Sequence, residues 1–376
     1  MSSENIKDIE DEGTSGRNLR DIRMVIYGRK WSGKTFAANT ILGGETLRLS
    51  ESIENRECVA EVGGRWRVRL VLTPGWWKPF LPNETMELVK LKMIQGVAQS
   101  GPAGPHALLL VIDTDTPMDE KSARAAEQHM ELLGGEAVWR HTVVVLNAGI
   151  WHEGDPTAPE VMARSGGFLG RIVRKCGGRH HLLNTDKTHP RQVLRLLEKL
   201  ERMVDHNGGQ AFRVDAALAL SAETRLRGVM EGVALRRATV PATRELLREM
   251  YRDHQLPEVR LLLMGWSLSG KSTLADSILG SPPGAGSPKG TTTVSTERRG
   301  RVGRWAVQTV DTPGWWRFGS TEDTPETVKQ EILKGVWLAG PPGPHAVVLV
   351  VCACLAFTEA HLRAIRQHMA FLGPDV

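Results

Sequence analysis

The sequence is poor in cysteine and tyrosine, with four and two among 376 residues, and it has no long apolar run. So few cysteines favour neither a disulfide framework nor a zinc site. The longest apolar run, residues 346–357, is too short to span a membrane and is predicted to be a strand that buries Cys352 and Cys354. The first twenty residues contain no apolar segment typical of signal peptides. These absences predict a cytoplasmic protein with no membrane span in this chain.

No strong excess of charge of one sign is present. The 48 lysine and arginine residues nearly balance the 43 aspartate and glutamate residues, which leaves a net charge of +5, and hydrophobic residues make up 41%. This composition is typical of a soluble globular protein, and so small an excess does not favour nucleic acid as a partner. At this length the chain has room for two domains of ordinary size, each with its own core.

The sequence contains a long internal repeat. GRKWSGKT at residues 28–35 recurs as GWSLSGKS at residues 265–272, and each copy is followed by the tripeptide ILG. LTPGWW, GPHALLLVI and EQHMELLG then recur as DTPGWW, GPHAVVLVV and RQHMAFLG at one constant spacing. The repeat predicts two copies of one domain, at residues 20–205 and 257–376, joined by a helical connector at residues 206–256. The second copy has no counterparts of the last two strands and last two helices of the first, so we expect either that the chain is a fragment or that the second copy is incomplete and packs against another segment.

Hydrophobic periodicity in the first copy switches regularly between strand and helix. Such alternation predicts an α/β fold with a mostly parallel sheet covered by helices on both faces. Ligands are then expected at the carboxyl ends of the strands. The predicted strands are residues 22–27, 67–72, 107–112, 142–146 and 180–183, and the predicted helices are residues 34–42, 84–99, 120–133, 159–175 and 191–204.

Both copies carry G-x-x-x-x-G-K-[ST] between a predicted strand and a predicted helix, which strongly indicates a P-loop NTPase. The glycines allow backbone N–H groups to surround phosphates at a helix N-terminus, where the helix dipole favours negative charge. Lys34 and Lys271 are expected to reach the β- and γ-phosphates, and Thr35 and Ser272 to bind Mg²⁺. The predicted nucleotide-binding residues of the two loops are Gly28, Arg29, Lys30, Trp31, Ser32, Gly33, Lys34 and Thr35, and Gly265, Trp266, Ser267, Leu268, Ser269, Gly270, Lys271 and Ser272.

The copies differ in their second motif. In the second copy, Asp311 is expected to hold Mg²⁺ through a water, and Gly314 to meet a γ-phosphate through its N–H. The first copy retains Gly75 but has Leu72 in place of the aspartate. Because leucine holds no metal-bound water, the first copy is predicted to bind Mg²⁺ weakly and to hydrolyse poorly. Leu72→Asp is therefore predicted to improve its Mg²⁺-dependent binding.

A segment after the P-loop is expected to supply a threonine to Mg²⁺. The second copy has three threonines at residues 291–293, of which Thr292 and Thr293 are the predicted metal ligands; the alternative is a solvated loop. In the first copy the corresponding residues are predicted to be 54–57, which contain no threonine. This difference also predicts a hydrolysis-deficient first copy.

Tryptophan follows the glycine of the second motif in both copies, as Trp76 and Trp315, each with a second tryptophan behind it. Many small GTPases have a glutamine there that orients the attacking water. An indole cannot do this as an amide does, so intrinsic hydrolysis is predicted to be slow even in the second copy. The pairs are expected either to pack the loop onto a neighbouring helix or to anchor an interface.

The sequence motifs for recognition of the nucleotide base are the least clear. After the predicted strand at residues 142–146 come Asn147 and then Ile150, where an aspartate normally selects guanine. Asn184, at the end of the last predicted strand, is predicted either to contact the base or to cap the following helix.

These motifs resemble the immunity-associated GTPases, the GIMAP/IAN or AIG-type G domains related to septins. The resemblance rests on ILG after the P-loop, TPGWW, GPHALLLVI, RAAEQHMELLGGEAVWRHTVVVL and KCGGRHHLLN, and covers about residues 20 to 210 and 257 to 376. It is similar to the fish-type members with several G domains in tandem. The resemblance implies tandem P-loop G domains, GTP or GDP with Mg²⁺ as ligands, and homo- or hetero-oligomers formed through the nucleotide-facing surfaces. The first copy departs from the family pattern at Leu72, at residues 54–57 and at Ile150.

Three functions fit these observations. One is a nucleotide-dependent assembly switch with slow hydrolysis in the second copy and a degenerate first copy. Another is a competent GTPase activated in trans by dimerisation, and the third is a nucleotide-independent scaffold. A small-molecule kinase is disfavoured, because the DTPG element senses a γ-phosphate and is no acceptor site. Candidate donors of a catalytic group in trans are Arg29, Arg298, Arg299 and Arg301.

Overall fold

The computed structural model describes residues 19–48, 53–77, 79–114, 118–147, 167–184, 191–250, 256–282 and 291–373. The chain divides into two compact units, Met1–Gly232 and Val233–Val376. Within the described ranges, no helix has the length and apolar character that a membrane crossing requires.

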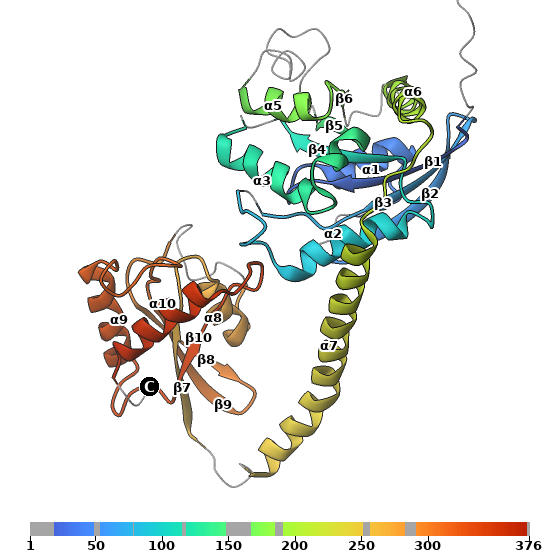
Figure 1. Ribbon diagram of the computed structural model, residues 1–376. Helices are drawn as coiled ribbons and strands as arrows, with labels where there is room; N and C mark the ends of the chain where they lie inside the picture. The colour runs from blue at the N-terminus through green and yellow to red at the C-terminus, as the bar shows by residue number, and fades with distance from the viewer. Residues whose placement is uncertain are drawn as a thin grey trace, which may run out of the picture. The chain divides into compact units, whose positions relative to one another are not determined.

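The first unit contains a six-stranded sheet in the order β2-β3-β1-β4-β5-β6 (Figure 1). All neighbouring strands run parallel except β2, which is antiparallel to β3. The predicted mostly parallel α/β sheet is thereby confirmed. Its strands are β1 (Asp21–Tyr27), β2 (Arg56–Val62), β3 (Trp66–Leu72), β4 (Ala107–Asp113), β5 (Thr142–Asn147) and β6 (His180–Leu183).

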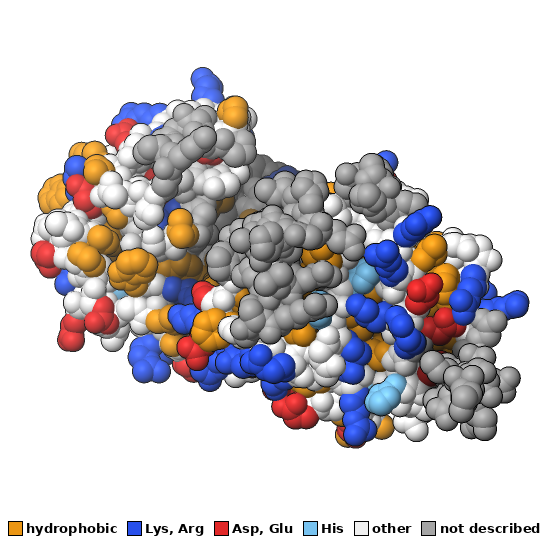
Figure 2. Space-filling model, turned by 90° about the horizontal axis from the view of Figure 1, so that it is seen from above, with side chains coloured by type: hydrophobic (Ala, Val, Ile, Leu, Met, Phe, Trp, Pro, Cys, Tyr) orange, Lys and Arg blue, Asp and Glu red, His pale blue; other side chains and the backbone are white. Residues whose placement is uncertain are grey.

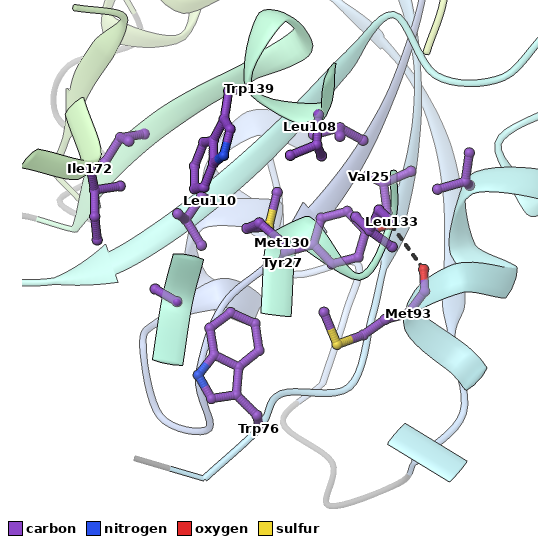
Figure 3. Close-up of a cluster of buried hydrophobic side chains, with 14 of the residues drawn as sticks. Val25, Tyr27, Trp76, Met93, Leu108, Leu110, Met130, Leu133, Trp139 and Ile172 are labelled. Atoms are coloured by element: carbon purple, nitrogen blue, oxygen red, sulfur yellow. Dashed lines mark hydrogen bonds between the residues drawn. The ribbon is translucent and has the colours of Figure 1, made fainter. Parts of the chain in front are cut away.

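Helices cover both faces of this sheet, because the central strands are apolar on both sides. Successive residues of β1 point to opposite faces: Met24 and Ile26 join one buried cluster, while Val25 and Tyr27 join the other. Figure 3 shows the cluster that contains Val25 and Tyr27, in which the Tyr27 hydroxyl donates to the Met93 carbonyl at 2.9 Å. The helices are α1 (Lys34–Leu42), α2 (Glu87–Gln99), α3 (Glu120–Glu131), α5 (Gly167–Lys175) and α6 (Arg191–His206), with a 3₁₀ helix at Gly135–His141.

Strand β2 was not predicted, and its presence corrects the interpretation of residues 54–57. Arg56 and Glu57 begin this strand and pair with Leu72 and Val71 of β3. The alternation in β2 is between partly buried and exposed residues, without a fully buried position. An edge strand of this kind lacks the apolar signal on which strand prediction depends.

The second unit contains a four-stranded sheet in the order β10-β7-β9-β8, in which only β8 is antiparallel to its neighbour. Its buried cluster joins strand residues Leu262, Met264 and Val310 to Ile332 and Ile365 of two covering helices. The elements are β7 (Glu258–Met264), α8 (Lys271–Leu279), β8 (Thr296–Val302), β9 (Trp305–Asp311), α9 (Glu326–Leu338), β10 (Ala346–Leu349) and α10 (Glu359–Ala370).

The predicted buried strand at residues 346–357 is wrong in length and burial. β10 ends at Leu349 and is partly exposed, because it lies at the edge of the described sheet, whereas β4 lies between β1 and β5. Cys352 and Cys354 follow the strand as half-buried residues, with their sulfurs 3.0 Å apart.

A long helix, α7 (Ala216–Met250), occupies most of the segment predicted as a connector (Figure 1). Its early residues Ala222 and Leu226 belong to the buried cluster of the first unit, together with Phe212. This part of the segment therefore contributes to the core of the first unit.

Candidate functional site

In both units the P-loop joins the first strand to the first helix at the carboxyl ends of the parallel strands. Gly33 and Gly270 directly precede α1 and α8 with φ angles of 82° and 97°, in the left-handed region that glycine adopts without strain. Neither helix has a side-chain cap or an acidic residue in its first turn. The N–H groups of these first turns are thus suited to bind an anion.

Trp31 and Leu268 occupy the same place in the two loops and share a left-handed backbone, with φ angles of 59° and 62°. Such angles are uncommon for large residues. The side chains are 74% and 82% exposed. We therefore expect these two predicted binding residues to contribute backbone groups to the loop.

The loop lysines, Lys34 and Lys271, are buried. Each Nζ donates to the carbonyls of the first two residues of its own loop, at 3.0 and 2.8 Å in the first unit and 3.2 and 3.1 Å in the second. Burial, together with the smaller effect of three basic neighbours that include Arg56, lowers the pKa of Lys34 to about 7. Burial lowers the pKa of Lys271 to about 8, against the opposing effect of the Asp311 carboxylate. The first loop therefore has the more positive surroundings.

The glycines of the second motif lie directly against the P-loops. A Cβ on Gly75 would lie 2.5 Å from Lys34 Nζ, and one on Gly314 would lie 2.4 Å from the Ser267 nitrogen. The adjoining backbones are hydrogen-bonded. Lys30 N donates to the Trp76 carbonyl at 2.6 Å, and Ser267 N donates to the Trp315 carbonyl at 2.8 Å. Only glycine permits this approach.

We predict that Gly314→Ala separates this segment from the second P-loop. Its Cβ would overlap backbone atoms, and overpacking of this kind costs about 1–3 kcal/mol. Thermal unfolding and nucleotide titration of the full chain would show a lower midpoint and weaker binding. Gly44→Ala is the matched control, since it lies outside the helices, its φ is not positive and no described atom lies within 4 Å of its Cβ position. Unchanged values for Gly314→Ala would refute the prediction.

Three oxygen-bearing side chains meet beside the second P-loop. The Ser272 hydroxyl donates to Asp311 Oδ2 at 2.5 Å and lies 3.1 Å from the Thr292 hydroxyl, which is 3.5 Å from the same carboxylate oxygen. Asp311 is 1% exposed, and its Oδ1 has no hydrogen-bond partner within the described ranges. Thr293, the other predicted ligand, is exposed and makes no contact of this kind among the described residues. Because hard oxygen donors are what Mg²⁺ prefers, the set of Ser272, Thr292 and Asp311 fits this ion.

The first unit places different groups at the corresponding position. Leu72 is buried in place of the aspartate. The Thr35 hydroxyl accepts instead from Arg56 Nη2 at 3.4 Å, and Arg56 Nη1 donates to the Arg48 carbonyl. A guanidinium therefore stands beside Thr35, where the second unit has a carboxylate beside its serine.

The strand register corrects the predicted counterpart of the threonines. Arg56 pairs with Leu72 as Thr296 pairs with Asp311. Counting back from Thr296 to Thr292, the same distance from Arg56 leads to Ser52, which lies outside the described residues. Residues 54–57 are therefore not the counterpart of the threonine segment.

The first tryptophan of each pair packs inside its unit. Trp76 and Trp315 are buried and stack on His129 and His368, with ring centroids 4.5 and 4.2 Å apart; Figure 3 shows Trp76 at the buried cluster. His129 also lies 2.8 Å from the Thr85 hydroxyl. The histidine comes from the repeated QHM motif, a signal that sequence reasoning did not connect with the tryptophan.

The second tryptophan of each pair is more accessible. Trp316 is 69% exposed, and half-buried Trp77 meets Trp31 edge to face at 4.7 Å. On the face shown in Figure 2, hydrophobic side chains lie among interspersed basic and acidic ones. The packing interpretation therefore applies to the first tryptophans, and the interface interpretation remains for the second.

We predict that the first unit loses stability in acid, partly through His129. Burial lowers its pKa to about 4, with a smaller effect from Lys90, against its hydrogen bond to the Ala125 carbonyl. A folded-state pKa below the unfolded value means that the contribution is intact above pH 6.5 and is lost as the pH falls toward 4, by about 1.4 kcal/mol per pH unit at most. His129→Gln should flatten the pH dependence of the free energy of unfolding, whereas His206→Gln, at an exposed position, is the control that should leave it unchanged. Equal slopes of unfolding free energy against pH in His129→Gln and the parent would contradict the prediction.

At the carboxyl end of β5 the structure brings Asn147 to the P-loop. Its Nδ2 lies 2.0 Å from the position of a Cβ on Gly33, and its Oδ1 is buried with no hydrogen-bond partner among the described residues. Sequence reasoning did not include Asn147 among the site residues. Asn184 lies at the same edge, because Leu183 pairs with Asn147, and its backbone N–H and carbonyl bond to the Gln192 side chain at 2.9 and 2.7 Å. Ile150 lies outside the described residues.

Three of the four arginines considered as catalytic groups donated across a dimer form ion pairs within their own units. Arg29 forms an ion pair with Asp113, Arg298 with Asp276, and Arg299 with Glu297. Arg301 is exposed.

Comparison with known proteins gives a consistent result. The sequence model of the AIG1 family matches residues 22–229 and 259–376. GTPase IMAP family member 8 of Rattus norvegicus is 23% identical over 342 residues, covering 89% of this chain and 42% of the relative. The Homo sapiens protein of the same name is 28% identical over 277 residues, covering 70% and 39%. This chain therefore spans about two fifths of the length of these curated relatives.

More distant similarities extend to plants. Immune-associated nucleotide-binding protein 10 of Arabidopsis thaliana is 24% identical over 200 residues, covering 50% of this chain and 42% of the relative. Among solved structures, Toc33 from Arabidopsis thaliana in complex with GDP and Mg²⁺ is similar with a TM-score of 0.41 at 16% identity, covering 52% of this chain and 89% of that one.

Proposed function

This chain belongs to the AIG1 family, and on that premise we propose that it is a guanine-nucleotide-binding protein whose second unit is a Mg²⁺-dependent switch with slow hydrolysis. The observation that carries the proposal is the meeting of Ser272, Thr292 and Asp311 beside Lys271. These side chains come from the P-loop, the threonine segment and the second motif. A group that holds the phosphates, a metal ligand set and a phosphate sensor thus share one site.

Each part of this site has a distinct task. Lys271 and the N–H groups at the start of α8 bind the phosphates. Gly314 lies against the loop, so its N–H is near any phosphate bound there. When bound, Mg²⁺ supplies charge that neutralises the phosphate oxygens. Binding of a γ-phosphate is therefore able to reposition both the Gly314 and Thr292 segments, which is the basis of a switch.

Slow hydrolysis follows from the environment of Trp315. Its ring stacks on His368, with an interplanar angle of 10°, and is buried. The side chain after Gly314 thus supports the fold and does not orient a water. The first unit, with Leu72 in place of the aspartate, is proposed to bind nucleotide without turnover.

Self-association is a second proposal, favoured by exposed aromatic side chains near both P-loops. Trp31 and Phe36 in the first unit are 74% and 51% exposed, and Trp316 and Phe318 in the second are 69% and 48% exposed. Large exposed aromatic residues are frequent anchors of interfaces. Sedimentation with and without GTP would detect such assembly. A chain that stays monomeric with every nucleotide would rule it out.

The test of the main proposal is titration of the full chain with fluorescent GTP, GDP and ATP, in Mg²⁺ and in EDTA. Guanine-selective binding with a Mg²⁺-dependent component is expected. Asp311→Asn should weaken that component, whereas the exposed Asp323→Asn should leave it unchanged. Absence of guanine preference in both conditions would overturn the proposal in favour of a scaffold whose function does not depend on nucleotide.

A further inference from the structure

We propose that the first unit binds a nucleoside di- or triphosphate without a divalent metal ion, with the Arg56 guanidinium neutralising the phosphates where the second unit uses Mg²⁺. This inference rests on the proposed nucleotide-binding function and concerns the first unit alone. It assigns a binding role to a residue of β2, outside the P-loop and outside the second motif.

The position of Arg56 is the first reason. Its Nη2 lies 3.4 Å from Thr35 Oγ1, the hydroxyl that the P-loop pattern assigns to Mg²⁺. Its Nη1 donates to the Arg48 carbonyl, which holds the other side of the guanidinium. Arg56 is also paired in register with Leu72, the residue that replaces the aspartate. The cation therefore stands beside the retained Thr35 hydroxyl and is paired with Leu72, the position at which this unit lacks the carboxylate of a metal site.

The balance of charge is the second reason. The first P-loop contains Lys30 in addition to Lys34, together with Arg29, whose charge is paired with Asp113, and Arg56 lies close enough to Lys34 to act on it electrostatically. The second P-loop contains Lys271 as its single basic residue and has the Asp311 carboxylate beside it. A divalent cation beside Thr35 would be repelled by Arg56, whereas one beside Ser272 would be attracted by Asp311. A polyanion alone matches the charge of the first site.

The remaining P-loop geometry of the first unit is intact. Ser32 is 0% exposed, and in the part of the chain that the structure describes its hydroxyl has no hydrogen-bond partner. The N-terminus of α1 has neither a side-chain cap nor an acidic residue in its first turn. Lys34 has the same pair of loop carbonyl contacts as Lys271. The cradle for phosphates is thus retained while Leu72 replaces the carboxylate ligand of the metal.

Arginine is chemically suited to this task. Its planar guanidinium stays charged and donates to two phosphate oxygens at once. A guanidinium does not coordinate water molecules as a metal ion does. A nucleotide bound in this way is expected to be held statically, and its affinity should depend on Arg56 and not on Mg²⁺.

The test uses the full chain carrying Lys271→Ala, which disables the second P-loop, titrated with fluorescent GDP and GTP in Mg²⁺ or EDTA. Affinities in the two conditions should agree within about threefold. Adding Arg56→Ala should weaken binding about 10- to 100-fold, as expected for loss of hydrogen bonds to a charged group, while Arg56→Lys should retain part of it. Arg65→Ala, which removes an ion pair with Glu201, is the matched control with unchanged affinity. Thermal unfolding confirms that each variant is folded.

The outcomes separate this inference from the proposed function. Mg²⁺-independent binding that falls with Arg56→Ala and is partly kept by Arg56→Lys supports the inference. Binding that needs Mg²⁺, or that is unaffected by Arg56→Ala, overturns it. The reciprocal Lys34→Ala chain reports on the second unit. If that chain binds and the Lys271→Ala chain does not, the inference alone fails; if neither the two variants nor the parent binds, the proposed function fails with it.

Discussion

Lys271→Ala is expected to abolish Mg²⁺-dependent nucleotide binding by the second unit, with a loss of about 100-fold or more in affinity. Lys271 Nζ is held over the loop by two carbonyl groups of that same loop, so a phosphate bound there meets the ammonium directly. Removing one partner of a buried, charge-assisted contact costs about 2–5 kcal/mol, and the middle of this range, about 3.5 kcal/mol, corresponds to more than 100-fold in affinity. Titration of the full chain in Mg²⁺ measures the component that disappears.

The fold should survive this substitution. Lys271 is 5% exposed, and burial of its ammonium is unfavourable in itself, so alanine removes a desolvated charge. A thermal midpoint within a few degrees of the parent is expected. Lys334→Ala, on the exposed side of α9, is the matched control that removes a lysine without affecting binding. Retention of Mg²⁺-dependent binding by a folded Lys271→Ala chain would contradict the assignment of this loop.

Rebuilding the metal site in the first unit is expected to make its binding depend on Mg²⁺. Leu72→Asp supplies the missing carboxylate, but Arg56 is paired in register with residue 72 and would form an ion pair with it. The double variant Leu72→Asp with Arg56→Thr removes that competitor and restores the pairing found between Thr296 and Asp311. We expect its affinity to rise about tenfold or more on adding Mg²⁺, since a carboxylate ligand is then present beside Thr35.

The single substitutions serve as controls for this result. Leu72→Asp alone should gain a smaller Mg²⁺ effect, because the new carboxylate is shared with Arg56, and Arg56→Thr alone should only weaken binding. All measurements are made in the Lys271→Ala background by titration with GDP in Mg²⁺ and EDTA. Equal Mg²⁺ dependence in the double variant and its parent would show that this position does not govern metal binding.

Much of the fold was predictable because the informative signals are local. The loop pattern lies between an apolar strand and an amphipathic helix, and the helix predicted at residues 34–42 matches α1 (Lys34–Leu42). The strand predicted at residues 180–183 likewise matches β6 (His180–Leu183). Central strands of parallel sheets are apolar on both faces, so they produce runs that are readily recognised. The predicted helix at residues 159–175 is described from Gly167 onward, as α5.

The errors concern strands at the edges of the sheets. β2 has no fully buried position, and β10 is shorter and more exposed than its apolar sequence predicts. Whether such a segment pairs, and where it stops, depends on which strand lies next to it. That neighbour is distant in the sequence, so periodicity within the segment does not contain the answer.

The sequence by itself determined the chemistry that each loop offers: two P-loops with a lysine and a hydroxyl, and an aspartate at position 311 against a leucine at position 72. These properties belong to residue types at short spacing, and local pattern is sufficient to recognise them. Only the tertiary structure decided that Thr292 and not Thr293 faces Ser272, that Arg56 stands beside Thr35, and that His129 stacks on Trp76. Each of these contacts depends on strand register or on helix packing between distant segments, and a shift of one residue along a strand would turn the side chain to the other face of the sheet.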